Sequence, residues 1–78
     1  MNDVYERFVN LLGGFGVQAD EVRPERTFND LDFDSLALVE IALVVQSEFG
    51  VSVDDDELTA EATVARATEV IKAKLVAV

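Results

Sequence analysis

Residues 35–49 carry the strongest helical pattern in the chain, and this pattern limits the folds that the chain can adopt. Apolar residues recur there at intervals of three and four, as on one face of an α-helix, at Leu38, Ile41, Ala42, Val45 and Phe49. Asp34 or Ser35 precedes the pattern as a potential cap, and Gly50 follows it as a potential left-handed cap. We therefore expect a helix over 35–49 whose apolar face packs against a core.

Two further helices are expected, over residues 3–12 and 64–76. Asp3 and Thr63 are suitable caps for them, and two consecutive glycines end the first pattern. Apolar residues recur at helical spacing in both segments, at Val4, Phe8, Leu11 and Leu12 and at Val64, Ala67, Val70, Ile71 and Leu75. The apolar faces of these two helices are surfaces against which the 35–49 helix can pack.

The connections between the helices differ in length. Residues 13–34 form a connection of about 20 residues, which is long for a compact domain, and Val17, Val22 and Phe28 are expected to anchor it to the core. Residues 54–58 begin with four acidic residues and predict a short helical turn. No β-strand pattern of useful length appears. The expected fold class is all-α, a small helical bundle with a long first loop.

The size and charge of the chain restrict its partners. With 78 residues it is expected to form a single domain over 1–78. Sixteen acidic and six basic residues give a formal net charge of -10, which argues against binding nucleic acids or anionic membranes and favours partners with basic surfaces. No apolar run approaches the ~20 residues of a membrane span, and the N-terminal residues do not resemble a signal peptide. We expect a cytoplasmic protein.

The residue types exclude most catalytic chemistry. The chain has neither cysteine nor histidine, so it lacks thiolate nucleophiles, disulfides and the usual general base. A nucleophilic Ser35 would need a lysine as its base, and the nearest lysine in the sequence is Lys72. The Gly-x-Ser-x-Gly motif of many serine hydrolases is also absent. We expect a protein that is not an enzyme.

Three alternating aspartates raise the possibility of a calcium site. Asp30, Asp32 and Asp34 have the spacing of the first ligands of an EF-hand loop. In that register Ser35 stands where a glycine is needed, and Ile41 stands where a bidentate glutamate is needed. We therefore expect no metal site of this type.

Apolar residues also occur on the outward side of the 35–49 helix. Leu36, Glu40, Leu43 and Ser47 lie opposite the core-facing residues, and Val39 lies on their flank. Two interpretations are open: these apolar residues are buried under the preceding connection, or they form a surface on which a partner docks.

Ser35 also has two interpretations. It lies at or beside a helix N-terminus, so either Ser35 or Asp34 can be a capping residue and nothing more. A phosphate on Ser35 would instead gain from the exposed N–H groups and the positive end of the helix dipole.

Several segments in order resemble acyl carrier proteins, and the similarity covers most of the chain. Asp34-Ser35-Leu36 with Val39-Glu40 is similar to the motif at which that family is modified. The flanking blocks that are similar to the family are Phe15-Gly16-Val17, Asp20-Glu21-Val22, Phe28-Asn29-Asp30-Leu31 and Glu48-Phe49-Gly50-Val51.

The resemblance implies an all-α, four-helix acyl-carrier-like bundle with three main helices, a short third helix and a long first loop. It also implies a covalent cofactor. Ser35 would be converted by a phosphopantetheinyl transferase, from coenzyme A, into a 4'-phosphopantetheine ester whose thiol carries acyl groups. Further implied partners are a ketosynthase with its chain-length factor, a malonyl transferase and tailoring enzymes, and we expect a monomer. The implied partner-binding residues are Asp34, Leu36, Val39, Glu40 and Leu43. The implied acyl-chain-lining residues are Leu38, Ile41, Val45 and Leu58.

The sequence also differs from the family and suggests a pathway. Asp32 stands where a glycine is frequent, and outward acidic residues are sparse on the 35–49 helix. The sequence around the motif resembles carriers of aromatic polyketide synthases more than fatty-acid carriers, at Leu31, Phe33 and residues 35–38. We expect a carrier of a type II polyketide synthase, with a carrier of type II fatty acid synthesis as the alternative. A peptidyl carrier and an unmodified acidic interaction module are less favoured.

Overall fold

Three α-helices make up most of the structure, a computed structural model that describes residues 4–76. They are α1 (Val4–Gly13), α2 (Ser35–Phe49) and α3 (Val64–Val76), and a short 3-10 helix, η1 (Ala19–Glu21), interrupts the first loop. Residues 4–76 contain no strand, and their only β-bridge joins Thr27 to Thr63. The predicted all-α fold class is confirmed. The cap predicted at Asp3 lies outside the described residues.

The helix boundaries follow the local sequence signals. The predicted ranges of α2 and α3 agree with the structure at both ends. Gly50 ends α2 in the left-handed region with φ 74°, and the Thr63 Oγ1 accepts a hydrogen bond from the Arg66 N–H at 3.0 Å. Both caps were expected, because each satisfies backbone groups that a helix terminus leaves unpaired.

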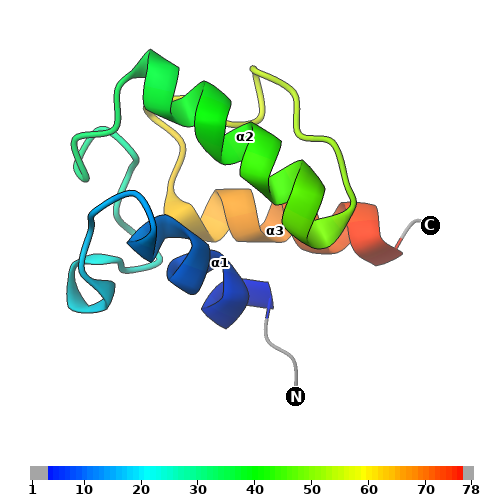
Figure 1. Ribbon diagram of the computed structural model, residues 1–78, viewed down its shortest axis with the longest axis horizontal. Coiled ribbons are helices and arrows are strands. Elements are labelled where there is room, and N and C mark those ends of the chain that lie inside the picture. Colours follow the sequence, from blue (N-terminus) through cyan, green and yellow to red (C-terminus); the bar gives the residue numbers. More distant parts are fainter. Residues whose placement is uncertain (1–3, 77–78) are drawn as a thin grey trace.

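The helix α1 packs against both α2 and α3, whereas α2 and α3 approach each other less closely (Figure 1). Phe8 and Leu12 of α1 are fully buried and face the inner sides of the other two helices. The fully buried side chains that form the centre of the core are Phe8, Leu12, Phe28, Ile41, Val45, Val64 and Ile71. The α2–α3 loop (residues 50–63) leaves the C-terminal end of α2 and returns past α2 to the start of α3 (Figure 1).

The α1–α2 loop (residues 14–34) is anchored as its apolar residues predict. Val22 and Phe28 are buried and Val17 is half-buried. The ring of Phe28 meets that of Phe8 edge to face, with 6.2 Å between the centroids, and it also contacts Phe33. Burying a side chain of this size contributes roughly 1.5–3 kcal/mol, so the aromatic cluster stabilises a loop that has little regular structure.

Backbone hydrogen bonds join this loop to the segment before α3. The N–H groups of Phe28 and Asn29 donate to the carbonyl oxygens of Ala62 and Ala60, at 3.1 and 2.9 Å. In the other direction, the N–H groups at residues 64 and 65 donate to the carbonyl oxygens at residues 26 and 24, both at 2.9 Å. The two loops therefore form one unit.

The short helical turn predicted at 54–58 is present as two successive turns, but the short third helix that the resemblance implies does not form. The N–H groups of Glu57 and Leu58 donate to the carbonyl oxygens of Asp54 and Asp55, three residues earlier, at 2.9 and 3.4 Å. The capping signal itself is present, since the Glu57 Oε1 accepts from the Asp54 N–H at 2.9 Å. The turns do not continue as a helix because residues 60–62 are committed to the hydrogen bonds with the α1–α2 loop.

Asp32 has an unusual backbone conformation. Its φ of 65° is in the left-handed region, and no other non-glycine residue among those described has a positive φ. A residue with a Cβ pays roughly 1–2 kcal/mol for this conformation, and glycine does not. A glycine at this position would adopt the turn without that cost.

We predict that Asp32→Gly is more stable than Asp32→Ala by about 1 kcal/mol. Both variants lose the same charge, so the comparison isolates the left-handed conformation. The free energy of unfolding in urea measures the difference. Equal stabilities would show that the turn does not require a left-handed residue.

Candidate functional site

Ser35 is the first residue of α2 and is exposed to solvent. Asp34 precedes it as the capping residue, and its Oδ1 accepts a hydrogen bond from the Ala37 N–H at 2.8 Å. Of the two residues that could cap the helix, Asp34 therefore has this role. The Ser35 hydroxyl is not needed as a cap and is available to other chemistry.

The first turn of α2 also presents unpaired donors. In an α-helix the first N–H groups have no acceptor within the helix, and Asp34 satisfies only the one at Ala37. The N–H groups of Ser35 and Leu36 remain directed toward the solvent at the positive end of the helix dipole. This is the environment in which a negatively charged group is stabilised.

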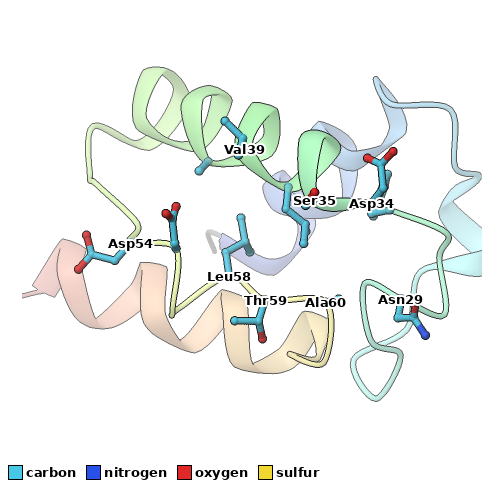
Figure 2. A pocket seen from close by; sticks show the side chains of 12 residues that line it. Asn29, Asp34, Ser35, Val39, Asp54, Leu58, Thr59 and Ala60 are labelled. Atoms are coloured by element: carbon cyan, nitrogen blue, oxygen red, sulfur yellow. The ribbon is translucent and has the colours of Figure 1, made fainter.

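A cavity of about 450 Å³ opens beside Ser35, between α2 and the α2–α3 loop (Figure 2). Leu58 extends from the loop toward α2 (Figure 2). Leu38 and Ala42 of α2 also line the cavity. The full lining comprises Asn29, Phe33, Asp34, Ser35, Leu38, Val39, Ala42, Asp54, Asp55, Leu58, Thr59 and Ala60. The serine thus stands at the edge of a cavity whose wall along α2 is mostly apolar.

The four predicted chain-lining residues divide into two pairs. Leu38 and Leu58 line the cavity. Ile41 and Val45 do not reach it, because they are fully buried in the core against the other helices. The pattern of α2 identifies its inner face, but it cannot separate residues that face α1 from residues that face the α2–α3 loop.

The five predicted partner-binding residues share one exposed surface. Leu36, Val39 and Leu43 are 67%, 50% and 62% exposed, so their burial under the α1–α2 loop, which the sequence left open, is wrong. Asp34 and Glu40 are also exposed. Docking at this surface stays a prediction.

Several lining residues were not predicted. Asn29, Thr59 and Ala60 reach the cavity because the two loops are hydrogen-bonded to each other. Such pairing joins residues about 30 positions apart and leaves no local pattern in a single sequence. Val44, 37% exposed on α2, was also missed, although its spacing from Leu36 places it near the outward face.

The α2–α3 loop is also held near its middle, at Glu57. The Lys74 Nζ lies 3.3 Å from the Glu57 Oε1, which is the only ion pair among residues 4–76. The hydrogen bond from the Asp54 N–H and the nearby Lys74 ammonium lower the pKa of Glu57 below its usual value. These contacts connect the wall of the cavity to α3.

In the part of the chain that the structure describes, no three side chains of the metal-binding types gather in one place. The aspartates at 30, 32 and 34 therefore do not form the site that their spacing suggests. None of the helices within 4–76 is both long and apolar enough to cross a membrane.

We predict that Asp34→Ala lowers the free energy of unfolding by about 1 kcal/mol, because the Ala37 N–H loses its acceptor. Asp34→Asn keeps a side-chain oxygen and should lose clearly less. The two variants have the same net charge, so urea unfolding of both measures the cap alone. Equal losses would contradict the role of Asp34 as the cap.

Comparison with known proteins gives a consistent result. The family model described as "Phosphopantetheine attachment site" matches residues 6–71. The acyl carrier protein of Petrotoga mobilis is 43% identical over 76 residues, which cover 95% of this chain and 89% of that protein.

Other similarities are shorter. The acyl carrier protein of Thermobifida fusca is 57% identical over 44 residues, 55% of this chain and 56% of that protein. The meromycolate extension acyl carrier protein of Mycolicibacterium smegmatis is 44% identical over 50 residues, 63% of this chain and 50% of that protein. In both cases the matched part spans less than two thirds of the relative.

Proposed function

Because the chain belongs to the acyl carrier protein family, whose attachment domain carries a 4'-phosphopantetheine group, we propose that Ser35 is the residue that bears this group. The observation that carries the proposal is the position of Ser35. Its hydroxyl is exposed at the N-terminus of α2, is not used as the cap, and lies at the edge of the cavity.

The residues around Ser35 fit such a group. The N–H groups of Ser35 and Leu36 would face the phosphodiester, whose negative charge suits a helix N-terminus. The bound group supplies a thiol, on which acyl groups are carried as thioesters, and the chain has no cysteine of its own. The cavity extends from Ser35 toward Leu58 and offers space along α2.

We propose that the acyl chain lies in this cavity, against Leu38 and Leu58. Burying apolar groups there is favourable by about 0.8 kcal/mol for each methylene. Ile41 and Val45 stand behind the wall in the core, and a longer chain would reach them only by displacing Leu38 or Leu58.

The proposed biochemical role is to hold growing chains for a type II polyketide synthase. The character of Leu31, Phe33 and residues 35–38 supports this pathway. A carrier of type II fatty acid synthesis is the second candidate, supported by relatives that are named simply acyl carrier protein and by one that is named for meromycolate extension. The mass of the bound chain separates the two, because each ketide unit keeps a carbonyl oxygen that a fully reduced unit lacks.

The partners of such a carrier would be the phosphopantetheinyl transferase, a ketosynthase with its chain-length factor, a malonyl transferase and tailoring enzymes. We propose that they dock on the surface formed by Asp34, Leu36, Val39, Glu40 and Leu43. All five are exposed and lie on or next to the helix that begins with Ser35. A cytoplasmic location stays a prediction.

We predict that incubation with coenzyme A and a phosphopantetheinyl transferase adds the mass of one phosphopantetheine group to the protein. Ser35→Ala should gain nothing, and Ser47→Ala, which alters an exposed serine at the other end of α2, should gain the full mass. Intact-protein mass spectrometry measures all three. An unmodified wild type, or a modified Ser35→Ala, would refute the attachment site.

We predict that acylation raises the melting temperature more in Leu58→Val than in wild type, because the chain fills the space that the lost methylene leaves. Ile71→Val is the matched control, since Ile71 is buried in α3 and does not line the cavity. Each substitution costs about 1 kcal/mol before acylation. Equal acyl-dependent increments in the two variants would show that the chain does not contact Leu58.

A further inference from the structure

The cavity beside the proposed attachment site combines apolar surface with carboxylates. Leu38 and Leu58 are among its apolar lining residues. Asp34, Asp54 and Asp55 also line it, and all three side chains are exposed and carry negative charge at pH 7. An acyl chain that leaves the solvent for this cavity therefore passes an acidic rim.

Two of the three aspartates stand away from the serine. Figure 2 shows Ser35 and Asp54 on opposite sides of Leu58, which extends toward α2. Asp55 follows Asp54 directly in the α2–α3 loop. A chain that enters beside Ser35 and extends past Leu58 therefore approaches these two carboxylates.

No cation in the lining offsets these charges. The chain has six lysine and arginine residues, all within residues 4–76, and none of them lines the cavity. Lys74 is close to the same loop, but its Nζ lies 3.3 Å from the Glu57 Oε1 and is engaged with that carboxylate. The cavity is therefore a negative environment for any group that enters it.

A second cavity near the start of α2 has the same character. Its volume is about 460 Å³, and it lies between the first turn of α2 and the α1–α2 loop. Glu21, Asp32 and Asp34 line it, and no lysine or arginine does. A group attached at Ser35 therefore meets carboxylates without a cation in both neighbouring cavities.

From this charge distribution, and resting on the proposed attachment site, we infer that the cavity beside Ser35 accepts uncharged acyl chains and excludes acyl groups that end in a carboxylate. Asp54 and Asp55 are the residues that discriminate. An ionised carboxylate that enters loses its water and gains no cation in return, and nearby charges of the same sign repel it. An uncharged chain gains from the burial of its apolar surface.

This discrimination separates the two kinds of group that the proposed role requires. Malonyl, which a malonyl transferase would load, ends in a carboxylate, whereas a growing chain does not. The malonyl group would stay in the solvent, where a partner enzyme can reach it. The growing chain would be sheltered against Leu38 and Leu58.

The experiment compares hexanoyl and adipoyl, two acyl groups of equal length of which only adipoyl ends in a carboxylate. A phosphopantetheinyl transferase loads each on Ser35 from its coenzyme A thioester, and intact-protein mass spectrometry establishes loading first. Hexanoyl should shift the methyl NMR signals of Leu38 and Leu58 and raise the melting temperature by about 4 °C or more. Adipoyl should leave both signals where they are in the unacylated form and should not raise the melting temperature.

The variant Asp54→Asn/Asp55→Asn removes both charges and offers amide N–H groups to a carboxylate. In this variant adipoyl should shift the same methyl signals and raise the melting temperature by at least half as much as hexanoyl does. The matched control is Asp20→Asn/Asp56→Asn, which changes the net charge equally at exposed positions that line neither cavity. Adipoyl should remain excluded in the control.

Four outcomes would overturn the inference. Equal effects of both groups on the wild type would show that the cavity does not discriminate, and no effect of either would show that uncharged chains do not enter. Exclusion of adipoyl from Asp54→Asn/Asp55→Asn would show that these two residues are not responsible. Its entry into the control would show that the net charge of the chain decides. In each case the loaded mass on Ser35 remains, so the proposed attachment site would stand.

Discussion

The hydrogen bonds between the two loops fix the position of Ser35. Residues 24–29 and 60–65 exchange four backbone hydrogen bonds, and Phe28 is buried between them and the core. The chain has no disulfide and no sheet within 4–76 that could otherwise hold a loop of this length. Because this pairing sets the path of residues 29–34, it also sets where α2 begins and which residues surround the cavity.

The helix α2 serves the core and the surface at the same time. Its inner side contributes Leu38, Ile41 and Val45 to the core, and its outer side exposes Leu36 and Leu43. A helix that is apolar on all sides is normally buried within a protein. Here one side of the helix is left uncovered, so the exposed Leu36 and Leu43 contribute little to the free energy of folding.

Helix bounds, which depend on residues close together in the sequence, could be predicted. Features that depend on hydrogen bonds between distant segments could not. The bounds of α2 and α3 were predicted correctly because Asp34, Gly50 and Thr63 act through neighbouring backbone groups. The turn at 54–58 was predicted, but the short third helix implied by the resemblance is absent, and the carbonyl oxygens of Ala60 and Ala62 accept from the other loop instead. For the same reason Asn29 and Thr59 could not be placed at the cavity in advance, although Ser35, Leu38 and Leu58 could.

The cap at Asp34 has a consequence for how the unmodified and modified proteins can be told apart. Since the helix begins through Asp34 and not through the Ser35 hydroxyl, the proposed esterification of that hydroxyl would break no hydrogen bond that α2 requires. Both forms can therefore share one scaffold. An enzyme that accepts only the modified carrier would therefore have to recognise the attached group itself.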